Sequence, residues 1–81
     1  MSFPLGCEVT WTSQAAGSRL AKRGIIVEVV PVSRLPKLRH KLESYGVARQ
    51  HESYIVEVQQ GGKRRSKHYW PNVSQLQAVK G

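Results

Sequence analysis

The stretch Ser53–Pro71, SYIVEVQQGGKRRSKHYWP, predicts a β-hairpin with positive charge at its tip and aromatic side chains at its base. Ser53–Gln59 alternates between apolar and polar residues, the pattern of a half-buried strand. Gly61-Gly62 supplies the positive φ angles that a tight hairpin turn needs. We therefore expect a partner strand over Ser66–Trp70, closed by Pro71. In the first strand the inward side chains are expected to be Tyr54, Val56 and Val58, and the outward ones Ile55, Glu57 and Gln59.

Two strands are predicted upstream of this hairpin. Gly6–Thr12 alternates, with Cys7, Val9 and Trp11 on one face. Gly24–Pro31 is β-branched almost throughout, which suits a pleated sheet. Between them the residues are small and polar without periodicity, so we expect a long loop that starts at Ser13–Gly17 and ends in positive charge at Arg19, Lys22 and Arg23.

Glu28 sets the expected phase of the second strand. With Glu28 outward, the side chains of Ile25, Val27 and Val29 should face the core. Ile26 and Val30 then fall on the outer face. That face is either covered by another segment or available as a contact surface.

The segment Ser33–Gly46 changes period. Its apolar residues Leu35, Leu38, Leu42 and Tyr45 are spaced by three, four and three, which places them on one helical face. Ser33 could cap the start of a short helix and Gly46 its end. The alternative is a long basic loop whose leucines hold it against the sheet.

The C-terminal stretch predicts a tight turn, of 3₁₀ type, over Asn72–Leu76 and a short strand over Gln75–Val79. Leu76 and Val79 are the expected core contacts there.

In sum, the sequence predicts one mainly β domain over residues 1–81. It has five short strands, and an insert, residues 33–52, lies between the second strand and the third. This order resembles the SH3-like barrel, and the ending YWPNVSQLQAV carries the resemblance, since an aromatic-Pro pair, a 3₁₀ turn and a terminal apolar strand are typical of that fold.

Within that fold, the ending also looks like the barrel of plasmid-borne trimethoprim-resistant dihydrofolate reductases. Those proteins carry a Val-Gln-Ile-Tyr-Pro run where this chain has Lys67-His68-Tyr69-Trp70-Pro71. The glutamine and the aliphatic residues of that run are missing here. The resemblance therefore implies the barrel and not the reductase activity, because one fold serves many functions.

Charge is the strongest global signal, because 13 Lys and Arg stand against 5 Asp and Glu among 81 residues, a net charge of +8. A small body with this excess attracts polyanions, and nucleic acid is the first candidate. Cys7 is the single cysteine, so neither an internal disulfide nor a thiolate metal cluster is expected. With no signal-peptide pattern and no long apolar run, a cytoplasmic protein without a membrane segment is expected.

The candidate binding residues are basic side chains and two aromatic neighbours. Lys and Arg bind phosphates with steep salt dependence, and aromatic rings can stack on bases. Tyr69 and Trp70 are adjacent on a strand, so they point to opposite faces and one of them should be exposed. The alternative is that the charges only keep the surface solvated and the aromatic residues only pack the core. The predicted nucleic-acid-binding set is Arg23, Arg39, Lys41, Lys63, Arg64, Arg65, Lys67, His68, Tyr69 and Trp70.

Enzymatic chemistry is not indicated. The histidines His40, His51 and His68 lack metal-ligand spacing, and Gly61-Gly62 lacks the pattern of a phosphate-binding loop. No catalytic residue, metal or cofactor is therefore expected.

The sequence favours a non-enzymatic nucleic-acid-binding module that takes DNA in preference to RNA. The rival interpretation is a protein-interaction or self-associating module that uses Ile26, Val30 and Ile55 as an exposed patch. In its small size and basic character, the protein also resembles accessory proteins of mobile genetic elements.

Overall fold

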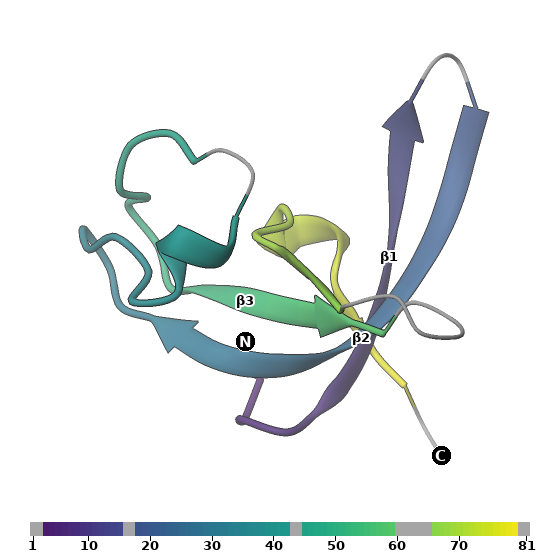
Figure 1. Cartoon of the computed structure of the whole chain (residues 1–81), viewed down its shortest axis with the longest axis horizontal. Helices are drawn as coiled ribbons and strands as arrows, with labels where there is room; N and C mark the ends of the chain where they lie inside the picture. The colour runs from purple at the N-terminus through teal and green to yellow at the C-terminus, as the bar shows by residue number, and fades with distance from the viewer. Residues whose placement is uncertain (1–2, 16–17, 43–44, 60–65, 80–81) are drawn as a thin grey trace.

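The computed structural model describes residues 3–15, 18–42, 45–59 and 66–79, which form a mainly β domain. Its elements are β1 (Glu8–Ala15), β2 (Ser18–Val30), η1 (Arg39–Lys41), β3 (Ser53–Val58), β4 (Lys67–Tyr69), η2 (Val73–Gln75) and β5 (Gln77–Ala78), η being a 3₁₀ turn. The five strands form one antiparallel sheet in the order β4-β3-β2-β1-β5. As Figure 1 shows, the sheet is strongly bent; β4 and β5 form its two edges, so the described strands do not close into a barrel.

The prediction of a long loop between the first two strands is wrong. β1 and β2 pair in continuous register from Glu8↔Ile25 to Ala15↔Ser18, so Arg19, Lys22 and Arg23 lie on a strand. The small polar residues of this segment show no apolar alternation, so their pattern did not indicate a strand there. The antiparallel backbone pairing of β1 and β2 continues through this segment.

The main core lies on the inner face of the bent sheet. Val9, Trp11, Ile26, Tyr54, Val56 and Leu76 form one buried cluster, with Cys7, Val58 and Tyr69 packed against it. The inward phases predicted for β1 and β3 are thus confirmed, as is the core position of Leu76. The Tyr54 hydroxyl donates a hydrogen bond to Glu52 Oε1 (2.6 Å) and accepts one from the Phe3 N–H (3.0 Å). Burial and the Glu52 carboxylate raise the pKa of Tyr54.

The phase predicted for β2 is wrong at Ile25 and Ile26 and confirmed at Val29, which packs against the core cluster. Ile26 is 1% exposed within the core and Ile25 is 46% exposed, the reverse of the expectation. The cause is a bulge at Val27, because Ile26 pairs with Val56 and Glu28 with the next residue of β3, Ile55. Because of this extra residue, an alternation counted back from Glu28 assigns Ile25 and Ile26 to the wrong faces.

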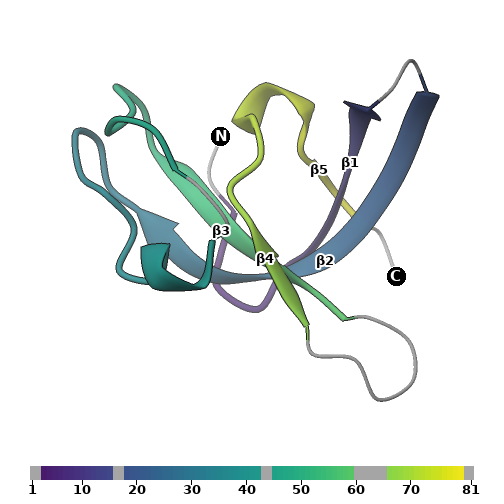
Figure 2. The ribbon, with the colours of Figure 1, turned by 45° about the horizontal axis from the view of Figure 1, so that its top comes forward.

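The outer face of the β2–β3 end is covered and does not form a contact patch. Val30 and Ile55 are both 0% exposed, so with Ile26 all three proposed patch residues are buried. Pro36 from the insert is also fully buried. The insert therefore supplies the cover that one of the two sequence interpretations required, and Figure 2 shows it beside this end of the sheet.

The helix predicted over Ser33–Gly46 is wrong for the described residues. Only the single 3₁₀ turn η1 forms, and residues 43–44 lie outside the described ranges. The Glu28 carboxylate explains the shape, because it accepts hydrogen bonds from the backbone N–H groups of Lys37 (2.6 Å) and Leu38 (2.8 Å). This anchor holds the segment in a loop against β2, and of its leucines Leu38 and Leu42 are half-buried, whereas Leu35 is 40% exposed.

The C-terminal part follows the sequence prediction in its order of elements, but β5 is shorter than the expected Gln75–Val79, and Val79 is not part of the core cluster. β3 pairs with β4 from Val56↔Tyr69 to Val58↔Lys67, whereas the Gly61-Gly62 turn lies outside the described residues. The 3₁₀ turn η2 is capped by Asn72, whose Oδ1 accepts a hydrogen bond from the Ser74 N–H at 3.3 Å. β5 then pairs with β1 at Val9 and Thr10. No helix in the described part of the chain is long and apolar enough to span a membrane.

Candidate nucleic-acid interface

A groove of about 330 Å³ separates the end of the insert from β4. Two basic residues distant in sequence meet there, Lys41 at the end of η1 and Lys67 at the start of β4. Both lysines are exposed. Among the described residues, the groove is lined by Lys41, Leu42, Ser66, Lys67, His68, Tyr69 and Trp70.

The basic groups of the groove differ in their freedom to bind an anion. Lys67 is exposed, at the outer end of the β3–β4 ladder. The side chain of His68 is only 8% exposed, and its Nε2 lies 3.4 Å from Glu57 Oε2 on the neighbouring strand. A protonated His68 would therefore be balanced by Glu57. Lys41 and Lys67 are thus exposed cations of the groove, whereas His68 faces an acidic neighbour.

Tyr69 and Trp70 are both half-buried, so the expectation that one of them would be exposed is not met. Tyr69 packs edge-on against Trp11, with ring centroids 5.9 Å apart. The Lys22 Nζ lies 4.7 Å from the centroid of the Tyr69 ring. Tyr69 is thus part of the scaffold and links β4 to the β1–β2 hairpin.

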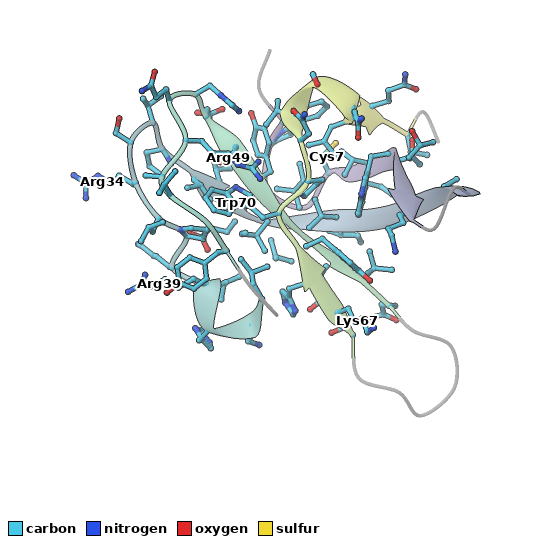
Figure 3. The ribbon with its side chains drawn as sticks, turned by 90° about the horizontal axis from the view of Figure 1, so that it is seen from above. Cys7, Arg34, Arg39, Arg49, Lys67 and Trp70 are labelled. Carbon is cyan, nitrogen blue, oxygen red and sulfur yellow. The ribbon has the colours of Figure 1, made fainter. Side chains whose placement is uncertain are left out.

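Trp70 is held by contacts that the sequence did not reveal. Its Nε1–H donates to Ser53 Oγ at 2.8 Å, and the Arg49 guanidinium lies 4.1 Å from the ring centroid. Arg49 also donates hydrogen bonds to the backbone carbonyls of Trp70 and Pro71, both at 2.7 Å. Figure 3 shows Arg49 and Trp70 together near the middle of the molecule. Burial lowers the pKa of Arg49 from its ordinary value.

Because Arg49 occupies one face of the Trp70 ring, at most the other face is open to a base. Sequence reasoning missed Arg49 because it stands 21 residues before its partner, in a segment without a periodic pattern. The two residues come together only in the folded chain. Trp70 is therefore a fixed wall of the groove rather than a mobile ring that could turn to stack on a base.

Of the other predicted residues, the structure describes Arg23 and Arg39, and neither lines the groove. Arg23 makes an exposed ion pair with Glu8, with Nε 2.6 Å from Oε2 and Nη2 3.1 Å from Oε1. The hydrogen bond and the negative charge of Glu8 raise the pKa of Arg23. Arg39 is exposed, and its Nη1 donates to the carbonyl of Pro36 at 2.9 Å. Lys63, Arg64 and Arg65 lie outside the described residues.

Comparison with protein-family models, with curated proteins and with solved structures found no match. Within the described ranges, no three His, Cys, Asp or Glu side chains gather in a way that could hold a metal ion. Function is therefore inferred from the charge and the geometry of the groove.

Proposed function

We propose that this protein is a non-enzymatic nucleic-acid-binding module that takes DNA in preference to RNA. The single observation that carries the proposal is the convergence of Lys41 and Lys67 on one groove, although 25 residues separate them in the chain. Two cations at one groove can neutralise neighbouring phosphates and release their counterions. The net charge of +8 strengthens this attraction over the whole surface.

The groove has a rigid wall beside its charges. The stack of Arg49 on Trp70 and the hydrogen bond from Trp70 to Ser53 fix one aromatic ring next to the two lysines. A fixed aromatic surface can pack against a sugar or an unpaired base at small entropic cost. Charge and aromatic surface together suit a nucleic-acid strand better than a simple acidic peptide.

We also propose that the open sheet is a variant of the SH3-like barrel. Support comes from the 3₁₀ turn η2, which joins β4 to β5 directly after Trp70-Pro71. The likeness to the trimethoprim-resistant reductase barrel concerns this architecture alone and carries no reductase activity.

A salt titration tests the function. Fluorescein-labelled duplex DNA, single-stranded DNA and RNA of mixed sequence are titrated with the protein at several salt concentrations, with binding followed by anisotropy. Duplex DNA should bind most tightly, and log K should fall linearly with log[salt], with a slope of about −0.9 per phosphate neutralised.

A pair of double variants locates the binding surface. Lys41→Gln/Lys67→Gln should make the slope shallower by about two, one for each lost phosphate contact. The matched control Arg34→Gln/Lys37→Gln removes the same charge from exposed side chains that do not line the groove, and it should leave the slope nearly unchanged. Absence of any DNA or RNA binding at low salt would refute the proposal.

A further inference from the structure

The outer part of the β1–β2 hairpin forms an arm without a third strand. β5 pairs with β1 only at Val9 and Thr10, and β3 pairs with β2 only from Ile25 onward. Within the described residues, Thr12–Ala15 of β1 and Ser18–Ala21 of β2 pair only with each other; we call these two segments the arm. Figures 1 and 2 both show it projecting away from the rest of the sheet.

The root of the arm is fixed beside the proposed binding groove. Trp11, 5% exposed, and its cross-strand partner Lys22 form the last residue pair before the arm. Both contact Tyr69 of β4, Trp11 edge-on and Lys22 with its ammonium over the ring. Because Tyr69 also lines the groove, the arm and the groove are held in a fixed relation to each other.

The composition of the arm suits a polyanion and does not suit a core. No acidic residue occurs from Val9 to Val27, whereas Arg19, Lys22 and Arg23 fall in this span. The arm itself is made mostly of short residues, many with hydroxyl or amide groups that can bond to base edges: Thr12, Ser13, Gln14, Ala15, Ser18, Arg19, Leu20 and Ala21. A two-stranded ribbon without a covering layer is marginally stable alone, so a bound partner would stabilise it.

The dimensions of the arm match one DNA groove. Four residue pairs, from Thr12↔Ala21 to Ala15↔Ser18, extend beyond the Trp11↔Lys22 pair, which at about 3.4 Å per residue gives a reach of roughly 14 Å. The major groove of B-DNA is about 8.5 Å deep and about 12 Å wide, and it admits a two-stranded β-ribbon. The minor groove, about 6 Å wide, would have to be widened before a ribbon could enter it, at a cost in DNA deformation.

We propose that the arm enters the major groove of duplex DNA while Lys41 and Lys67 contact phosphates beside it. This inference rests on the proposed nucleic-acid function and names its substrate as B-form duplex. Duplex RNA is disfavoured because its major groove is deep and narrow. The arm would make contacts that depend on the groove, whereas the lysines would make contacts that depend only on the backbone.

A duplex with a filled major groove tests the inference. Cytosines that carry a glucosylated 5-hydroxymethyl group place bulk in the major groove and leave the phosphates unchanged. The full-length protein should bind the unmodified duplex about tenfold more tightly than the filled duplex, the loss expected for one base-directed contact set.

A shortened arm provides the matched variant. Residues 14–19 are replaced by Asn-Gly, so that Ser13 and Leu20 flank a two-residue turn. Ser13↔Leu20 lies two residue pairs inward of Ala15↔Ser18, which flanks a two-residue connection in the native chain, so the hydrogen-bonding phase of the ladder is preserved. The shortened arm reaches only about 7 Å beyond Trp11↔Lys22, less than the depth of the groove. Arg34→Gln, which removes the same single charge and keeps the arm, is the control.

The shortened variant should bind both duplexes equally, at the affinity that the full-length protein shows for the filled duplex, and Arg34→Gln should keep the preference for unmodified DNA. If the full-length protein binds both duplexes equally with the salt slope intact, the arm does not enter the major groove, and the proposed function survives. A preference that persists in the shortened variant also overturns the role of the arm. If no nucleic acid binds at all, both proposals fall together.

Discussion

At the scale of single residues, Arg49 joins parts of the chain that are far apart in sequence. Its guanidinium lies over the Trp70 ring and donates to two backbone carbonyls, and the Trp70 Nε1–H reaches back to Ser53 on β3. One side chain thus connects the insert, the end of β4 and, through Trp70, the β3 strand. Such a forked set of contacts requires the planar guanidinium, which an ammonium group cannot replace.

We therefore expect Arg49→Ala to lower the free energy of unfolding by about 2–3 kcal/mol, because two carbonyls lose their charged donor and the ring loses its stacked cation. Arg49→Lys should recover less than half of this loss. Urea unfolding followed by Trp fluorescence measures both. Arg34→Ala, at an exposed position, is the control and should change stability by less than about 0.5 kcal/mol. Equal midpoints for the Arg49→Ala and Arg34→Ala variants would contradict the role given to Arg49.

At the scale of elements, Gly24 permits the close approach of β2 and β3. A Cβ atom at this position would lie 2.5 Å from the Glu57 carbonyl oxygen and 2.6 Å from Val56 Cγ1. The carbonyl belongs to the backbone of β3 and cannot move without disturbing the ladder. Gly24 lies one residue before Ile25, where the pairing of β2 with β1 ends and its pairing with β3 begins.

Gly24→Ala should destabilise the domain by about 2–3 kcal/mol through overpacking against β3. Gly46→Ala is the matched control, because a Cβ there meets no atom within 4 Å. The control should be neutral or stabilising by up to about 1 kcal/mol, since alanine restricts the unfolded chain. Thermal unfolding of the two variants compares them directly, and a Gly24→Ala variant as stable as Gly46→Ala would show that β3 can yield.

The elements also show what the sequence can and cannot predict. Alternation located the strand at Ser53–Val58 and the inward phase of Val9 and Trp11, because a sheet face that covers a core must be apolar. It failed on β2, where both faces are buried near Val30 and a bulge at Val27 reverses the phase. Neither the burial of a strand's second face nor a bulge can be recognised from the alternation of apolar and polar residues in the sequence.

Long-range contacts limited the prediction of the site in the same way. The basic segments near Lys41 and Lys67 were visible in the sequence, but their meeting at one groove depends on how Glu28 anchors the insert. The leucine spacing at Leu35, Leu38 and Leu42 favoured a helix, yet two backbone hydrogen bonds to one carboxylate set a loop. Tertiary contacts outweighed the helix preference of the local sequence.

At the scale of the whole molecule, self-repulsion and binding both follow from the net charge of +8. Any polyanion relieves the repulsion, but only a ligand that binds the folded site stabilises it by mass action. At a duplex DNA concentration about 100 times Kd, linkage contributes about 2.7 kcal/mol. For a domain of this size we expect a rise in Tm of roughly 10 °C or more.

Differential scanning fluorimetry with duplex DNA and with polyglutamate at equal charge separates the two effects. Polyglutamate carries negative charge without a regular phosphate backbone or grooves, so its shift in Tm should be a small part of the shift with DNA. Lys41→Gln/Lys67→Gln should lower the DNA shift toward the polyglutamate value, whereas Arg34→Gln/Lys37→Gln, with the same net charge, should keep most of it. If duplex DNA and polyglutamate shift the Tm of the unaltered protein equally, the surface responds to charge alone. A site for nucleic acid on the folded protein must distinguish the phosphate backbone from a chain of carboxylates.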